Sequence, residues 1–340
     1  MGILQPALQN TELSPAYWQE FDDIKEKEAA NISHFRASDG YNLTVYEFGE
    51  RGRPTIVIVC ALATPFLLLT RLASLLAEHY HVLSWENRGG PFLHEGRLDV
   101  ALSVARQAQD MREIIADRDI GGFHVISLCS GAPIVAWAAS EAALPIKSVS
   151  LFGPSGLGVP DQRSQYQDTF APMILDIGAE DTPETRRNAQ VLQDYVRARH
   201  TDDGLVGETS RLTYLNMRDV DAITGFARLM TEYWGGDMED RFARFDEMCR
   251  RHPVMVMHAL DDPIMHYSAS VKGCLRTGLP KLVLYPAGGH FQLCERNSEI
   301  VRDLLTFMAE YDDAMAAMSP DWPALQPGLY LGPLWAVDWT

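Results

Sequence analysis

The chain has 340 residues, of which 46% are hydrophobic and 22% charged, and its net charge is −17. This composition is typical of a globular protein with a substantial core. The negative charge disfavours binding to nucleic acid and to an anionic membrane surface. The first residues lack a signal-peptide pattern, and no stretch reaches the ~18 apolar residues of a membrane span. We therefore expect a cytoplasmic protein.

The cysteines predict neither a metal site nor a disulfide framework. There are five of them, an odd number, at wide spacings and without a C-x-x-C pair: Cys60, Cys129, Cys249, Cys274 and Cys294. Free thiols suit a reducing compartment. We expect no metal and no cofactor.

The first half of the chain alternates between strands and helices. Two strand-like runs, 32–37 and 43–48, flank an Asp-Gly turn that is typical of a hairpin. Buried strands are then predicted at 55–60, 82–85, 123–128 and 146–152, with helices after 65, over 99–118 and from 131 onward. Such alternation indicates βαβ units and a mostly parallel sheet.

The alternation stops after Pro154 and resumes at 254–258 and 282–285, followed by a helix around 300–308. Residues 155–250 show only helical signals, such as a capping box at Asp181–Glu184 and an apolar stripe that ends at Gly235. We expect a leader with a short helix (1–31), an α/β core (32–154 and 251–310) and a helical insertion (155–250). A Pro- and Trp-rich tail (311–340) is too apolar for a linker and should pack on the body or on a second copy in a homodimer.

The segment S-L-C-S-G follows a buried strand and precedes a helix. It resembles the nucleophile elbow of the α/β-hydrolase superfamily, in which small residues stand two places before and after the nucleophile. Ser127 and Gly131 take those places around Cys129. With Ser130 as nucleophile, a leucine would occupy a crowded place, and Ser127 would come too early after the strand. Cys129 is therefore the expected nucleophile.

The resemblance also supplies the partners of Cys129, in the family's order along the chain. Asp262, just before Pro263, matches the acid position, with Asp261 as the alternative. His290, in Y-P-A-G-G-H, matches the catalytic histidine. The interval between acid and histidine leaves room for one helix and one strand, as the fold requires.

The resemblance further implies two backbone donors for an oxyanion hole. One is the N–H of Ser130, directly after the nucleophile. The other comes from the loop after the third strand, which usually starts with His-Gly and here reads Cys60-Ala-Leu-Ala; alignment selects the Leu62 N–H. The run W-E-N-R-G-G at 85–90 resembles the family's D-x-R-G-x-G loop and should have a structural role.

The chemistry expected from these residues is acyl transfer through an acyl-cysteine. The histidine would accept the thiol proton and the aspartate would orient the imidazole. The substrate would be a small acyl ester or thioester, with coenzyme A or a carrier protein as the acyl donor to consider. Hydrolysis and transfer to another acceptor both stay open. A hydrolase-fold protein that binds or scaffolds without turnover is the alternative, and His258 is expected to be structural.

Overall fold

The computed structural model describes residues 31–89, 102–141, 143–157, 163–197, 219–295 and 297–313. Nearly all of the expected leader and of the expected tail lie outside these ranges; Asn31, the last residue of that leader, begins the first strand. The described residues form an eight-stranded sheet in the order β1-β2-β4-β3-β5-β6-β7-β8. Its strands are β1 (Asn31–Arg36), β2 (Asn42–Phe48), β3 (Thr55–Val59), β4 (His81–Trp85), β5 (Phe123–Leu128), β6 (Ile146–Phe152), β7 (Val254–Ala259) and β8 (Lys281–Tyr285).

The strand pairing matches the predicted α/β class. β1 and β2 form the antiparallel hairpin expected around Asp39-Gly40, and Gly40 takes a φ of +85° in the turn. β2 is also antiparallel to β4, whereas all later neighbours are parallel. The mostly parallel sheet predicted from the alternation of strands and helices is therefore confirmed.

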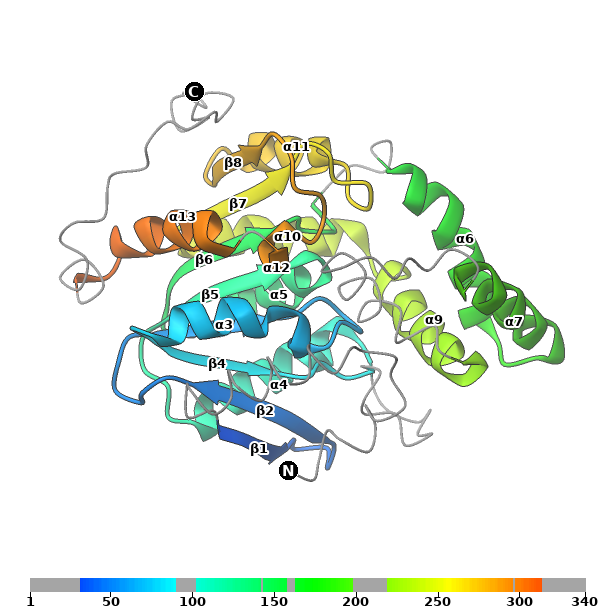
Figure 1. Cartoon of the computed structure of the whole chain (residues 1–340), viewed down its shortest axis with the longest axis horizontal. Coiled ribbons are helices and arrows are strands. Elements are labelled where there is room, and N and C mark those ends of the chain that lie inside the picture. The colour runs from blue at the N-terminus through cyan, green and yellow to red at the C-terminus, as the bar shows by residue number, and fades with distance from the viewer. Residues whose placement is uncertain are drawn as a thin grey trace.

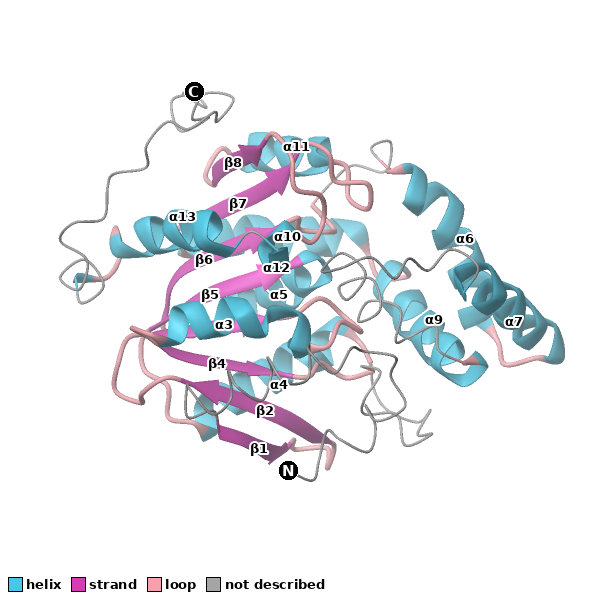
Figure 2. Ribbon diagram, viewed as in Figure 1, coloured by secondary structure: helices cyan, strands magenta, loops and turns pink. Residues whose placement is uncertain are grey.

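Helices cover both faces of the sheet (Figure 2). One face carries the 3-10 turn η1 (Phe66–Leu69), α3 (Thr70–Ala77), α12 (Gln292–Glu295) and α13 (Asn297–Ala309). The other face carries α4 (Val104–Asp117), α5 (Ala132–Glu141), α10 (Met238–Arg251) and α11 (Tyr267–Thr277).

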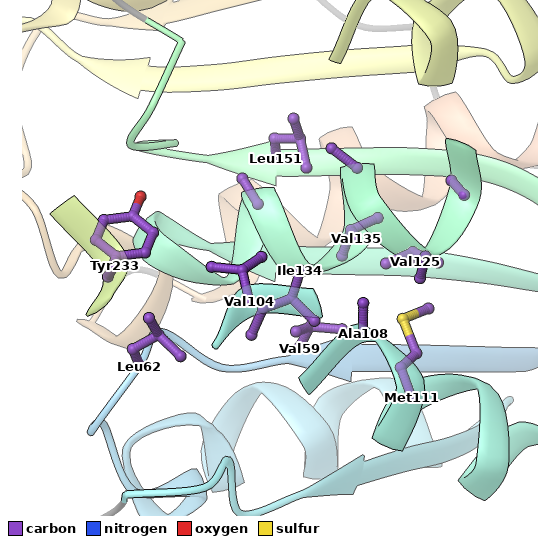
Figure 3. Packing of buried hydrophobic residues seen from close by; sticks show 14 of the residues in the cluster. Val59, Leu62, Val104, Ala108, Met111, Val125, Ile134, Val135, Leu151 and Tyr233 are labelled. Carbon is purple, nitrogen blue, oxygen red and sulfur yellow. The ribbon is translucent and has the colours of Figure 1, made fainter. Parts of the chain in front are cut away.

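The strands supply both cores because successive side chains point to opposite faces. On β3, for example, Ile56 and Ile58 belong to the core under α3 and α13, whereas Val57 and Val59 belong to the core under α4 and α5. Figure 3 shows part of this second core, with Ala108 and Met111 of α4 beside Ile134 of α5. The continuous apolar strands of the sequence are thus explained by burial on both faces.

Three helices form a layer of their own: α6 (Gln165–Ala179), α7 (Pro183–Arg197) and α9 (Val220–Trp234). Figure 1 shows them beside the carboxyl ends of the parallel strands, away from the two flanking layers. α6 and α9 approach very closely at Gly178, where a Cβ would lie 2.3 Å from Thr231 Oγ1 and 2.4 Å from the Ala227 carbonyl oxygen. We call α6, α7 and α9 the helical layer.

The last helix of the predicted insertion, α10, packs against α5 of the core. The Arg244 guanidinium lies 3.5 Å from the centre of the Trp137 ring across this contact. The helical layer therefore ends with α9, before the expected boundary at residue 250.

The predicted cap of α7 is displaced by one residue. Thr182, not Asp181, accepts the first-turn hydrogen bond, from the Thr185 N–H at 3.2 Å. Pro183 is the first helical residue, where its fixed φ and missing N–H are tolerated, so the residue before it becomes the cap. Asp181 pairs instead with Arg186. α6 was not foreseen, although Ser164 and Gln167 form a complete capping box at its start.

Candidate active site

The predicted site residues come together where the parallel strands end. Cys129 directly follows β5, and Asp262 and His290 lie in the loops after β7 and β8. Because the carboxyl ends of parallel strands meet at one edge of a sheet, residues more than a hundred positions apart become neighbours there.

Cys129 occupies a strained turn. Its φ is +46°, a left-handed conformation that is uncommon for residues other than glycine, and it begins the 3-10 turn η2 (Cys129–Gly131) that leads into α5. The neighbours leave no room at Gly131, where a Cβ would lie 2.7 Å from the carbonyl oxygens of both Val59 and Cys60. The small residue expected two places after Cys129 is therefore required by contact with β3.

The other candidates for the nucleophile are less accessible. Ser127 is fully buried within β5, and Ser130 is buried against the loop after β3. All five cysteines are unpaired, and Cys129 alone among them is partly exposed. Burial raises the pKa of the Cys60, Cys249 and Cys274 thiols. Cys129 is thus the most accessible of the five thiols.

His290 is held by Asp262, not by the alternative Asp261. Its Nδ1 lies 2.7 Å from Asp262 Oδ2, and both side chains are buried. Asp262 Oδ1 accepts hydrogen bonds from the N–H groups of Ile264 and Met265, each at 2.8 Å. These contacts fix the carboxylate from both sides.

Asp261 has a different task. Its Oδ1 accepts hydrogen bonds from the Gly288 and Gly289 N–H groups at 2.9 and 2.8 Å. Gly289 has a φ of +64°, and His290 follows it immediately. Adjacent aspartates therefore divide the work: Asp261 shapes the loop and Asp262 contacts the imidazole.

His258 is hydrogen-bonded on both ring nitrogens, as a structural histidine would be. Its Nδ1 lies 2.7 Å from Ser270 Oγ, and its Nε2 lies 2.8 Å from the Met265 carbonyl oxygen and 3.2 Å from Asp262 Oδ2. Burial alone would raise the pKa of Asp262, but hydrogen bonds from His258 and His290 outweigh it and hold that pKa well below its usual range.

The environment of His290 favours its charged form. Burial acts to lower its pKa, but the negative charge of the Cys129 sulfur and hydrogen bonds with Asp262 and Cys129 raise the pKa of His290 to about 10. Since Nδ1 is engaged by Asp262, Nε2 is the nitrogen that serves Cys129. Cys129 and Asp262 together therefore favour the protonated imidazole of His290.

The two backbone donors expected for an oxyanion hole differ in their hydrogen bonding. The Ser130 N–H precedes the first hydrogen bond of the turn, which Ala132 N–H donates to the Cys129 carbonyl, so it has no acceptor within the helix. The Leu62 N–H, however, already donates to Ser130 Oγ at 2.8 Å. Alignment of the loop could not reveal this contact, because it depends on the Ser130 side chain.

The loop after β3 is supported by the W-E-N-R segment. Asn87 Nδ2 donates to the Cys60 carbonyl at 2.7 Å, and the buried Glu86 carboxylate accepts from the Phe66 N–H at 3.1 Å. Arg88, fully buried, bonds both Asp110 on α4 and Asp39 in the first hairpin. The structural role expected for this segment follows from these contacts.

The helical layer reaches the elbow through Tyr233 of α9. Its hydroxyl is hydrogen-bonded to Ser155 Oγ, and the Ser155 N–H donates to the Cys129 carbonyl at 3.2 Å. Burial, with the nearby charge of Cys129, raises the pKa of Tyr233 to about 12. Neither residue was predicted from the sequence, in which Tyr233 lies only beside the apolar stripe that ends at Gly235 and Ser155 only after β6.

Comparisons with solved structures identify the fold. The chain is similar to a putative lipase from Acinetobacter baumannii AYE (TM-score 0.67, 14% identity, covering 89% of this chain and 98% of that one). It is also similar to a bacterial membrane phospholipase A described as a virulence factor (TM-score 0.66, 17% identity, 87% and 92% covered). A third similar structure is the enol-lactonase from Burkholderia xenovorans LB400 (TM-score 0.60, 16% identity, 82% and 100% covered).

These structures, together with the strand order and the elbow, define the class of protein: the chain has the α/β-hydrolase fold. Compared by sequence, the chain matches no protein-family model and no curated protein. Within the part of the chain that the structure describes, every helix is too short or too polar to cross a bilayer.

Proposed function

We propose that the protein is an acyl-transfer enzyme that acts on small esters or thioesters through an acyl-Cys129 intermediate. The observation that carries the proposal is the arrangement of Cys129, on a strained turn, against a buried imidazole whose other nitrogen lies 2.7 Å from a buried carboxylate. Lipases, esterases and an enol-lactonase among the similar structures support ester chemistry as the class.

The reaction would begin with the Cys129 thiolate and the His290 imidazolium. The sulfur attacks the acyl carbon, and the carbonyl electrons move to the oxygen, where the Ser130 N–H can stabilise the charge. Collapse of this adduct breaks the bond to the leaving alcohol or thiol, which takes the proton from His290 Nε2. The product is an acyl-cysteine thioester and a neutral imidazole.

The second half returns the enzyme to its starting state. His290 now accepts a proton from water or from another nucleophile, which attacks the thioester carbon and releases Cys129 as a thiolate. Water gives hydrolysis, whereas an amine, alcohol or thiol gives transfer. A thiolate is a good leaving group, so both outcomes are chemically open to this site.

The helical layer supports a lid role. It lies beside the strand ends that carry the site (Figure 1). Its residue Tyr233 is hydrogen-bonded to Ser155, whose N–H donates to the Cys129 carbonyl. A lid here would determine which acyl groups reach the sulfur and would limit water during transfer. Any coenzyme A or carrier partner would have to bind a local basic patch, since the net charge is −17.

Intact-mass spectrometry tests the proposal. The protein is mixed with acyl thioesters and p-nitrophenyl esters of increasing chain length and quenched in acid within seconds. One acyl group should be found on Cys129 in wild type and none in Cys129→Ala. Cys274→Ala, which removes a buried thiol on α11, is the matched control and should still acylate.

Partition of the acyl-enzyme then distinguishes the two outcomes. Adding amines, alcohols or thiols should divert the acyl group from the free acid to a new product if the enzyme is a transferase, and should not if it is a hydrolase. Absence of both turnover and acyl-Cys129 with every substrate class would contradict the proposal. Slow, equal alkylation of all five thiols would instead indicate a binding protein.

A further inference from the structure

The Ser130 side chain stands where the second oxyanion donor was expected. Its Oγ accepts a hydrogen bond from the Leu62 N–H at 2.8 Å, so the donor selected by alignment already has an acceptor in this structure. The backbone N–H of the same residue is the first expected donor, and it has no acceptor within the turn. Both expected donors therefore involve Ser130: one is its own backbone N–H, and the other is hydrogen-bonded to its side chain.

A hydroxyl that accepts one hydrogen bond still has its own proton to donate. Among the described residues, no acceptor for the Ser130 hydroxyl proton is found, although the residue is 93% buried, with 7% of its surface exposed. A buried donor without an acceptor is costly in a resting protein unless something takes the proton during function. This hydroxyl proton belongs to the residue that directly follows Cys129, the proposed nucleophile.

From this geometry we propose that the Ser130 hydroxyl is the second donor of the oxyanion hole, with the Leu62 N–H behind it. The inference rests on the proposed acyl chemistry of Cys129. When the thiolate adds to the acyl carbon, the oxygen gains the carbonyl electron pair and accepts two hydrogen bonds from Ser130, one from N–H and one from Oγ–H. The Leu62 N–H stays on Ser130 Oγ and polarises the hydroxyl, which makes it a stronger donor.

The competing arrangement predicts the opposite response to substitution. If the Ser130 hydroxyl only covers the Leu62 N–H and rotates away when substrate binds, its removal frees that N–H for the substrate. Ser130→Ala would then be as active as wild type, or more so. If the hydroxyl is the donor, Ser130→Ala leaves the oxygen with one direct hydrogen bond and a more distant N–H.

Two reagents that both use the sulfur separate the oxyanion from the nucleophile. An alkyl trifluoromethyl ketone forms a tetrahedral adduct with Cys129 whose oxygen carries negative charge. Iodoacetamide alkylates the same sulfur and creates no oxyanion. We expect Ser130→Ala to weaken the affinity for the ketone about 10- to 100-fold and to lower kcat for ester cleavage by a similar factor. This effect is smaller than that of losing a donor completely, because the substitution frees the Leu62 N–H to act as a more distant donor.

The rate of alkylation by iodoacetamide should change less than about twofold, since the substitution leaves the Cys129 sulfur and its contact with His290 in place. Ser130→Thr, which keeps the hydroxyl, should restore most of the ketone affinity. Ser150→Ala, a buried serine on the neighbouring strand β6, is the matched control and should behave as wild type. Thermal melting establishes that each variant is folded.

The outcomes are distinguishable. Wild type that neither forms acyl-Cys129 nor binds the ketone refutes the proposed function, and the role of Ser130 with it. Wild type that does both, alongside a Ser130→Ala variant with unchanged kcat and ketone affinity, refutes the role of the hydroxyl alone. A parallel loss of ketone affinity and alkylation rate would show general damage to the elbow and would also overturn the inference.

Discussion

Replacing the Cys129 sulfur should change the titration of His290. The pKa of His290 lies at about 10, against 6.5 for an unperturbed histidine, even though burial acts in the other direction. That difference corresponds to about 5 kcal/mol in favour of the imidazolium, at ~1.4 kcal/mol for each pH unit. Both the charge of the sulfur and a hydrogen bond with it contribute, and Asp262 supplies the remainder.

Cys129→Ala removes both sulfur contributions and leaves burial opposed only by Asp262. The pKa of His290 should therefore fall. Cys129→Ser keeps a hydrogen-bonding partner without the charge, so the two variants separate the contributions. Proton NMR of Cε1–H signals in histidine-labelled protein, followed from pH 5 to 10.5, measures the effect. His124 is the internal control, because burial lowers its pKa to about 4 and it lies at the start of β5, away from Cys129, so its signal should not change between variants.

The same shift has a consequence for stability. A folded-state pKa raised above the unfolded value adds stability that is fully present below about pH 6.5 and is lost as the pH rises through about 10. The difference in Tm between wild type and Cys129→Ala should therefore shrink between neutral pH and about pH 10. Identical His290 titrations in wild type and Cys129→Ala would refute the thiolate–imidazolium arrangement.

Other substitutions test the surroundings of the site. Asp261→Ala removes the acceptor for two N–H groups beside His290 and should lower kcat about tenfold, with little change in Tm, because the imidazole is misplaced rather than lost; unchanged kinetics would contradict a positioning role. Gly131→Ala should destabilise by about 1–3 kcal/mol in urea unfolding, since its Cβ meets two carbonyl oxygens at 2.7 Å; wild-type stability would mean that the elbow relaxes freely. Arg88→Met leaves Asp110 buried without its main partner and should cost about 3–5 kcal/mol in the same assay, provided that Asp110 stays ionised. A loss under 1 kcal/mol would show that Arg106 compensates.

Much of the fold could be predicted from the sequence because its signals are local. The β-branched run of β3, the Asp-Gly turn and the crowded elbow each follow from steric or burial rules that act over a few residues. The proximity of Cys129, His290 and Asp262 could also be predicted, since the carboxyl ends of strands in a parallel sheet share one edge.

The remaining features depend on contacts between distant segments. The Ser130 hydroxyl reaches Leu62 only because the loop after β3 passes beside the elbow. Asp261 and Asp262 are neighbours in one loop, but their side chains have different partners: Asp261 accepts from the Gly288 and Gly289 N–H groups, and Asp262 contacts His290. α10 joins the core through the stacking of Arg244 on Trp137, which no pattern within α10 specifies.

The short chain of contacts from Tyr233 through Ser155 to the Cys129 carbonyl gives the elbow a second attachment, outside the sheet. If α9 moves outward to admit a substrate, the hydrogen bond between the Tyr233 hydroxyl and Ser155 has to break. The elbow then loses the contact that links it to the helical layer. An open helical layer would then leave the nucleophile elbow with one supporting contact fewer than the closed arrangement has.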